Sequence, residues 1–224
     1  MSRPFAPRPS TPRRRFLATC AAAAASATLG RLAHADEVSD ALAEISRARA
    51  GLKTLVAPFT QERTIGLLAT AVKSEGELTL VRPDRLRWEL KPPDAITYWV
   101  TPEGLAFATA SGGASMARTG AGRFGAVLGD LMVFLGGDLE ALRARYEITV
   151  PSRAGSMTLV ARPKADDVKK HVKSLTLSLS PERWSAERVV IEENGGDKSV
   201  ITFGKATRDV KVDPAKMVPP AKSG

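Results

Sequence analysis

Cysteine and histidine are nearly absent from this chain of 224 residues. The single cysteine, Cys20, and one of the two histidines, His34, lie within the first 35 residues, so residues 36–224 contain no cysteine and only His171. This absence excludes disulfides, cysteine-rich zinc sites and thiol catalysis from that part of the chain. His171 lies in the polar run 166–173, which is typical of a solvated hairpin loop and not of a catalytic triad.

Motifs for catalysis and nucleotide binding are also lacking. The glycines between residues 112 and 125 are not followed by the Lys-Ser/Thr of a P-loop, and no metal-spaced cluster or nucleotide fingerprint is present. Two pairs of adjacent carboxylates, at 166/167 and 192/193, need not converge on a substrate, because neighbouring strand residues point to opposite faces. We expect these carboxylates to face solvent, and we expect no catalytic residue, no metal site, no cofactor and no enzymatic activity.

Acidic residues are missing from the first 35 positions, and this absence explains most of the formal net charge of +9. Six of the 33 basic residues lie there, so residues 36–224 hold 27 basic and 24 acidic groups. Aromatic residues make up only 5% of the chain. Nearly balanced charge and few aromatic side chains argue against nucleic acid as a partner, because its binding depends on phosphate contacts and base stacking.

The N-terminal segment is typical of an export signal. A basic arm precedes the alanine-rich run 18–29, and a small-x-small cleavage site follows immediately before Asp36. Paired arginines followed by Phe-Leu favour the twin-arginine (Tat) class, with the general secretory (Sec) route as the alternative. The residues that carry this prediction are Arg13, Arg14, Phe16, Leu17, Ala33 and Ala35. The run is shorter than the roughly 20 apolar residues of a membrane-spanning helix, so we predict cleavage after Ala35 and a periplasmic domain over residues 36–224.

Strand patterns dominate the rest of the chain. Runs such as 76–80 and 86–90 alternate between apolar and polar residues, so each has one apolar face. Turn-forming residues, including Pro92-Pro93 and the segment 194–197, separate the runs at intervals typical of antiparallel hairpins. The sequence predicts about nine to eleven strands, in one mainly β domain without an internal repeat or a linker.

Three segments have helical spacing instead. An amphipathic helix is expected over residues 39–52, with Gly51 near its end. A second helix is expected over residues 127–135, after a flexible approach rich in Gly, Ser, Ala and Thr at 110–125, and a third, short one over 139–146. The last two form an apolar helical insertion between strands.

Several sequence fragments occur in the order and spacing of one known family. They are Phe59-Thr60-Gln61-Glu62-Arg63, Gly76-Glu77-Leu78, Val81-Arg82-Pro83-Asp84-Arg85-Leu86-Arg87-Trp88, Pro92-Pro93 and Val212-Asp213-Pro214-Ala215-Lys216. This series resembles the LolA family of periplasmic outer-membrane lipoprotein carriers. The similarity covers residues 36–105 well and continues more weakly through the later strands.

The resemblance implies an incomplete antiparallel β-barrel, covered by a helical lid, with an apolar cavity for acyl chains. It implies that Arg82 hydrogen-bonds the lid and helps to govern cargo release; the alternative is a surface arginine beside a turn. The cavity or motif residues would be Phe59, Gln61, Leu78, Leu80, Leu86, Trp88 and Leu90. The candidate lid residues are Leu128, Leu131, Phe134 and Leu135, with the N-terminal helix as another part of the lid.

The implied role is in outer-membrane biogenesis. A monomeric carrier without a cofactor would take acylated lipoproteins or other lipids from an inner-membrane lipoprotein-release transporter and deliver them to an outer-membrane acceptor. Two alternatives stay open: a LolA-like sensor whose lipid binding changes a protein interaction, and an accessory carrier of another acylated envelope molecule.

Overall fold

The computed structural model describes residues 37–66, 70–110, 112–116, 122–136, 139–151 and 156–220. The chain from Val38 onward forms one compact unit. The export signal predicted for residues 1–35 lies outside the described residues. Among the described residues, no helix is long and apolar enough to cross a membrane, and no group of His, Cys, Asp or Glu is placed to hold a metal ion.

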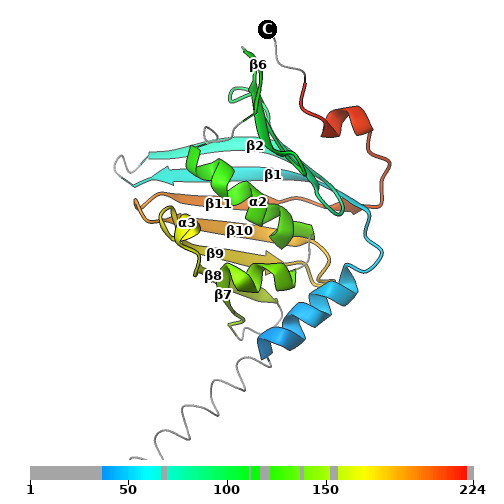
Figure 1. The fold of residues 1–224 in the computed structure, drawn as a ribbon, viewed down its shortest axis with the longest axis vertical. Helices are drawn as coiled ribbons and strands as arrows, with labels where there is room; N and C mark the ends of the chain where they lie inside the picture. The colour runs from blue at the N-terminus through cyan, green and yellow to red at the C-terminus, as the bar shows by residue number, and fades with distance from the viewer. Residues whose placement is uncertain are drawn as a thin grey trace, which may run out of the picture. The chain divides into compact units, whose positions relative to one another are not determined.

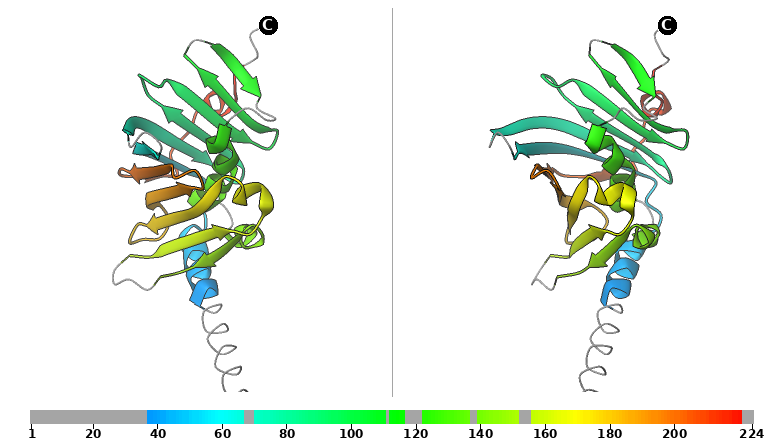
Figure 2. Two further views of the ribbon diagram at one scale, coloured as in Figure 1. Left: turned by 90° about the vertical axis from the view of Figure 1, so that its left-hand side faces the viewer. Right: turned by 60° about the vertical axis from the view of Figure 1, so that its left-hand side comes forward.

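One antiparallel sheet forms most of the compact unit (Figure 1). Its strands lie in the order β6-β5-β4-β3-β2-β1-β11-β10-β9-β8-β7, and the two-residue β12 pairs with β1. The strands are β1 (Thr54–Ile65), β2 (Thr70–Val81), β3 (Arg85–Leu90), β4 (Ile96–Thr101), β5 (Gly104–Thr109), β6 (Gly112–Met116), β7 (Tyr146–Thr149), β8 (Thr158–Pro163), β9 (Val172–Leu179), β10 (Ala186–Glu193), β11 (Lys198–Phe203) and β12 (Thr207–Arg208). The sheet curves strongly (Figure 2), and within the described ranges its two edge strands, β6 and β7, do not pair with each other. The predicted mainly β fold with an unclosed antiparallel sheet is therefore confirmed.

The register of the strands aligns apolar residues in rows across the inner face of the sheet. One row consists of Leu55, Leu80, Leu86 and Val100. The next row consists of Ala57, Leu78, Trp88 and Tyr98. All of these except the half-buried Tyr98 belong to the buried core. Because a strand sends alternate residues to opposite faces, the alternation seen in the sequence places its apolar side here.

The helices cover both faces of the sheet. The N-terminal helix is described from residue 37 to 48, and the others are α2 (Gly122–Gly136), η1 (Leu139–Ala144), α3 (Asp166–Lys169) and η2 (Pro214–Met217). In both figures α2 lies across the inner face. The short η2 packs against β3 on the outer face, where the indole Nε1 of Trp99 donates a 2.9 Å hydrogen bond to the carbonyl of Lys216.

The helical insertion differs from the sequence prediction at both ends. Helix α2 begins at Gly122, and β6 lies in the stretch that was expected to be a flexible approach. Strand β6 forms through backbone pairing with β5, which needs no alternation of side chains and therefore leaves little trace in the sequence. The third helix is the 3-10 helix η1, which ends at Ala144, so that Tyr146 begins β7.

Two charged segments can be compared with their predictions. Residues 164–171 connect the antiparallel strands β8 and β9, as the predicted hairpin loop requires, and this connection contains the four-residue helix α3. The expectation that Glu193 faces solvent is wrong: its side chain is 8% exposed and lies 3.6 Å from the guanidinium of Arg63. A carboxylate can be buried at this position because Arg63 on β1, two strands away in the sheet, compensates its charge.

Candidate binding site

The inner face of the sheet and α2 enclose an apolar interior. Five of the predicted cavity or motif residues are buried in it: Phe59, Leu78, Leu80, Leu86 and Trp88. The ring of Phe59 lies 4.2 Å from that of Trp88, centroid to centroid. Both rings contact the ring of Phe203 edge-on, at 6.1 and 6.2 Å. The aromatic cluster joins β1, β3 and β11, and it makes this part of the interior the most densely aromatic.

A glycine makes room for this cluster. Gly76 lies directly opposite Phe59 in the β1–β2 pair. A Cβ atom at position 76 would lie 2.2 Å from Cζ of Phe59 and 2.2 Å from the carbonyl oxygen of Glu89. The ring of Phe59 therefore packs over the bare backbone of Gly76, which no other residue could provide without displacing it.

Helix α2 closes the interior. The four predicted lid residues, Leu128, Leu131, Phe134 and Leu135, are all buried in the same core cluster as the sheet residues. At the end of the helix, a Cβ on Gly136 would lie 1.9 Å from Cδ2 of Leu80. The narrow gap between Leu135 and the strands has no room for a water molecule. Helix α2 is therefore packed in close contact with the sheet.

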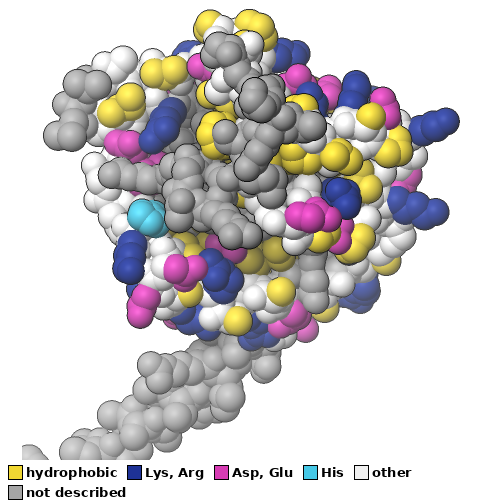
Figure 3. All heavy atoms as spheres, turned by 45° about the horizontal axis from the view of Figure 1, so that its top comes forward, with side chains coloured by type: hydrophobic (Ala, Val, Ile, Leu, Met, Phe, Trp, Pro, Cys, Tyr) yellow, Lys and Arg dark blue, Asp and Glu magenta, His cyan; other side chains and the backbone are white. Residues whose placement is uncertain are grey.

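The interior continues, less completely covered, along β3 to β5. Leu90, Tyr98 and Leu105 are only partly buried against the core, and Tyr98 and Phe107 are ring neighbours at 6.2 Å. Partial burial raises the pKa of the Tyr98 hydroxyl above its ordinary value. Figure 3 shows hydrophobic side chains exposed among charged ones on the face that it presents. Of the predicted cavity residues, Leu90 belongs to this half-buried region.

Gln61 is the polar member of the predicted set. It follows Phe59 on the same face of β1 and is 9% exposed. Its Oε1 atom has no hydrogen-bond partner within the part of the chain that the structure describes. Along the inner face of β1, the apolar side chains of Leu55, Ala57 and Phe59 are therefore followed by the amide of Gln61.

A buried polar cluster fixes the middle of α2 to the edge of the sheet. Asp130 accepts hydrogen bonds from the Tyr146 hydroxyl at 2.6 Å and from Nε of Arg145 at 3.0 Å. Burial, and then the bond to the Asp130 carboxylate, raise the pKa of Tyr146 well above its ordinary value. Phe134 packs edge-on against the same tyrosine ring at 5.7 Å. The helix is thus tied to β7 by one charged and one aromatic contact.

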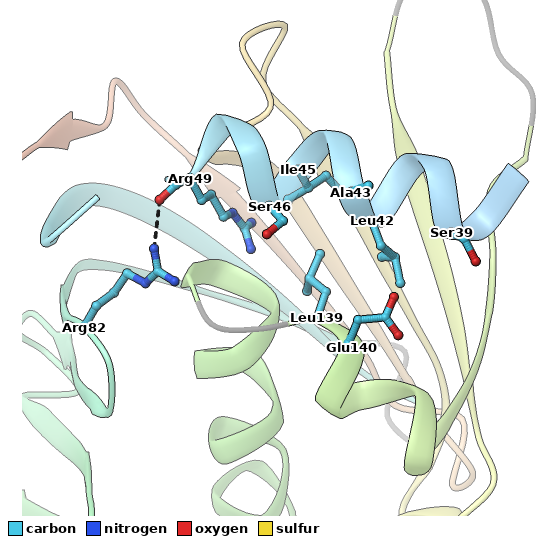
Figure 4. A pocket seen from close by; sticks show the side chains of 9 residues that line it. All are labelled: Ser39, Leu42, Ala43, Ile45, Ser46, Arg49, Arg82, Leu139 and Glu140. Carbon is cyan, nitrogen blue, oxygen red and sulfur yellow. Dashed lines mark hydrogen bonds between the residues drawn. The ribbon is translucent and has the colours of Figure 1, made fainter. Parts of the chain in front are cut away.

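Arg82 lies in the turn between β2 and β3 and reaches the end of the N-terminal helix. Its Nη1 donates a hydrogen bond to the carbonyl of Arg49 at 2.8 Å (Figure 4). The same atom donates to the carbonyl of Leu52 at 3.4 Å. These carbonyls lie just beyond the C-terminal end of the helix, where a cation is favourable, and that of Arg49 also accepts from the backbone N–H of Leu52 at 3.1 Å. Among the described residues Arg82 has no hydrogen bond to α2, and its bonds go to the chain at the end of the N-terminal helix.

Arg49 makes the connection to α2. Its side chain is among the largest fully buried ones, and Nη2 donates a 2.9 Å hydrogen bond to the carbonyl of Phe134 near the end of α2. Burial, together with the charge of Arg82, lowers the pKa of Arg49 to about 10. The two arginines therefore link the β2–β3 turn, the N-terminal helix and α2 in series.

The family model described as "Outer membrane lipoprotein carrier protein LolA" matches residues 50–217. The chain belongs to the LolA family. The matched segment includes the whole sheet path, α2 and Arg82, and it begins one residue after Arg49. No curated protein sequence gives a significant match.

Solved structures share the LolA-like fold at low sequence identity. A DUF1329 family protein from Desulfovibrio piger is 10% identical, with a TM-score of 0.50 over 81% of this chain and 97% of that one. The MucA/MucB complex of Pseudomonas aeruginosa (14% identical, TM-score 0.47, 81% and 60% covered) and a LolA superfamily protein from Nitrosomonas europaea (7%, 0.47, 80% and 96%) are also similar.

The sequence analysis did not identify three residues of the candidate binding site, which are Arg49, Asp130 and Tyr146. Arg49 follows Leu42 and Ile45 at helical spacing and so lies on the buried face of its helix, which is the signal that could have identified it. Asp130 is an acidic residue within the apolar run of α2. No sequence pattern identified Tyr146 as a site residue, because its hydrogen-bond partner Asp130 lies on α2, a different element.

Proposed function

We propose that this LolA-family protein is a carrier that shields the acyl chains of lipoproteins, or of another acylated envelope molecule, in its apolar interior. Each CH₂ group hidden from water contributes about 0.8 kcal/mol, so a multiply acylated molecule crosses an aqueous compartment only inside such a shield. The observation that carries the proposal is the continuous apolar face of the sheet closed by α2. The family description supports it.

Loading requires α2 to move, because the gap beneath it is too narrow even for water. The polar contacts that resist this movement among the described residues are few: Arg49 with the Phe134 carbonyl, and Asp130 with Tyr146 and Arg145. Each of these bonds has a charged partner, and such a hydrogen bond contributes about 1.5–3 kcal/mol. Open and closed states that differ by a few such bonds interconvert without unfolding the sheet.

The carrier reaches the periplasm by Tat export, and its signal peptide is cleaved after Ala35. It acts there as a monomer, receives acylated cargo from an inner-membrane lipoprotein-release transporter and passes it to an outer-membrane acceptor. Arg82 acts on release, because it holds the end of the N-terminal helix and, through Arg49, the end of α2.

Purification from the protein's own envelope, followed by mass spectrometry of the co-purifying molecules, tests this function. We expect acylated cargo in the purified protein and release of lipoproteins from spheroplasts when the protein is added. Leu128→Asn, which puts an amide in the buried interior, should reduce both, whereas Val72→Asn at an exposed position should not. An empty protein that releases no lipoprotein contradicts the carrier function, and a different acylated molecule in the purified protein assigns it to that molecule.

A further inference from the structure

A pocket lies between the N-terminal helix and η1, and the turn that carries Arg82 borders it. Its volume is about 450 Å³. The residues that line it are Ser39, Leu42, Ala43, Ile45, Ser46, Arg49, Arg82, Leu139 and Glu140. Figure 4 shows Arg82 and Arg49 toward one end of this pocket and Ser39 and Glu140 toward the other. The pocket is thus polarised, with positive charge at one end.

The positive end of the pocket has no acidic counterpart among its described lining residues. Within the described residues, neither Arg49 nor Arg82 forms an ion pair, whereas Glu140 at the opposite end is paired with Arg143 at 3.3 Å. Two guanidinium groups that share a pocket repel each other, and the effect of Arg82 on the pKa of Arg49 reflects this repulsion. An anion between them would remove that repulsion.

The helix ends satisfy only part of the hydrogen-bonding capacity of the two arginines. The carbonyls of Phe134, Arg49 and Leu52 accept one bond each from the two guanidinium groups. The Nε and Nη1 atoms of Arg49 are buried and have no acceptor among the described residues. A buried donor without an acceptor is costly and rare in native proteins, so these two N–H groups point to a missing acceptor.

We propose that the Arg49–Arg82 end of this pocket binds a phosphate group, either that of an anionic lipid headgroup or free phosphate. Two guanidinium groups and the nearby Ser46 hydroxyl suit an anion with several oxygens, because each guanidinium presents donors in a fork. The apolar wall formed by Leu42, Ile45 and Leu139 gives the first carbon atoms of a lipid a surface beside the anion. This site goes beyond the proposed carrier function, which assigns no ligand to the pocket; Leu42, Ile45 and Leu139 belong to the same buried core as the proposed acyl-binding interior.

Calorimetric titration with inorganic phosphate, and separately with dihexanoyl phosphatidic acid, tests the site. Uncharged dihexanoylglycerol reports binding through acyl chains alone and so separates a failure of this site from a failure of the carrier function. We expect Arg49→Met and Arg82→Met each to weaken phosphatidic acid binding about tenfold or more, as the loss of a charge-assisted hydrogen bond predicts. Arg47→Met, an exposed arginine on the same helix, is the matched control and should bind as the unchanged protein does.

The outcomes separate the two sources of phosphate. Tighter binding of phosphatidic acid than of inorganic phosphate assigns the pocket to a lipid headgroup, and equal binding assigns it to the free anion. Circular dichroism establishes that each variant is folded; should Arg49→Met unfold, Arg82→Met alone decides. Binding that is absent, or that is the same in Arg47→Met and the folded variants of the two site arginines, overturns the proposal.

Discussion

Arg82 is connected to the lid helix α2 through Arg49. It donates to the backbone carbonyl of Arg49 at 2.8 Å, while the side chain of Arg49 donates to the carbonyl of Phe134 at 2.9 Å. The C-terminal ends of two helices thus converge on two guanidinium groups, one of them fully buried. We therefore expect a change at Arg82 to reach α2 through the position of residue 49, and under the proposed function the release of cargo depends on both arginines.

Arg82→Leu should accept cargo but pass it on slowly. The substitution removes two hydrogen bonds to the N-terminal helix and so shifts the lid toward its open, cargo-holding state by about 1–2 kcal/mol, which corresponds to roughly tenfold slower transfer. Transfer of a fluorescent lipopeptide to acceptor vesicles measures the rate. Arg85→Leu, which loses only a distant pair with Glu103 at 4.0 Å, is the control, and equal rates for the two variants would reduce Arg82 to a surface charge.

Two glycines of α2 should respond in opposite directions to alanine. Around Gly129 there is open space, whereas a Cβ on Gly136 meets Leu80 at 1.9 Å. Gly129→Ala should therefore stabilise the protein by up to about 1 kcal/mol through helix propensity. Gly136→Ala should destabilise it by about 1–3 kcal/mol and push the end of α2 off the sheet. Urea unfolding and the binding of a hydrophobic dye measure both effects, and a stabilised Gly136→Ala variant would show that the lid is not packed in this way.

Asp130→Asn should loosen α2 from β7. The change removes the charge that pairs with Arg145 and weakens the bond from the Tyr146 hydroxyl, at a cost of about 1–3 kcal/mol for a buried polar contact. Hydrogen exchange of the α2 amides should then become faster. Asp166→Asn is the control, because its carboxylate is 93% exposed and lies 3.9 Å from Lys169; exchange that is equally fast in both variants would contradict the anchoring role.

The stability of the protein should fall above about pH 10, partly because of Tyr146. Its pKa is raised in the folded state, so the folded protein holds this proton more firmly than the unfolded chain, whose tyrosines titrate near pH 10. The stabilising contribution is complete below that pH and is lost as the pH rises through the folded-state pKa. Urea unfolding at pH 9 and at pH 11 measures this effect. The free energy of unfolding should fall less between these two pH values for Tyr146→Phe than for the unchanged protein.

Tyr98→Phe provides the comparison for this pH effect. Tyr98 is the only other tyrosine of the chain, and its pKa is raised mainly by partial burial, without the Asp130 carboxylate. Between pH 9 and pH 11, the free energy of unfolding should therefore fall more steeply in Tyr98→Phe than in Tyr146→Phe. If Tyr146→Phe declines as steeply as the unchanged protein, the hydroxyl of Tyr146 is not held by Asp130 in solution.

Residues that share a local pattern were predictable from the sequence, and residues joined by tertiary contact were not. The alternation at 76–80 and 86–90 is sufficient to place Leu78, Leu80 and Leu86 on the inner face, because strand geometry fixes the face of each residue. Strand β6 carries no such alternation and is formed by pairing with β5. The contact of Arg49 with Phe134 spans 85 positions in the chain, so no local pattern could reveal it.

The resemblance to the LolA family predicted one site residue, Arg82, that the residue patterns alone did not single out. It pointed to Arg82 as a residue that contacts the lid, and the geometry adds that the contact is to the N-terminal helix. It offered no counterpart for Asp130, whose position within an apolar helix becomes intelligible only when Tyr146 and Arg145 are seen beside it. Buried polar partners of this kind depend on the folded arrangement of several elements.

The central claim, that acyl chains lie in the interior beneath α2, is tested most directly by tryptophan quenching. Trp88 lies buried in the interior, whereas Trp99 is buried on the outer face beneath the C-terminal segment. Two proteins that each keep one of these residues as the sole tryptophan, with phenylalanine at the others, would be titrated with a lipopeptide whose acyl chains carry bromine atoms. We expect strong quenching of the fluorescence of Trp88 and little quenching of that of Trp99. Quenching of Trp99 alone, or of neither residue by a lipopeptide that binds, would contradict it.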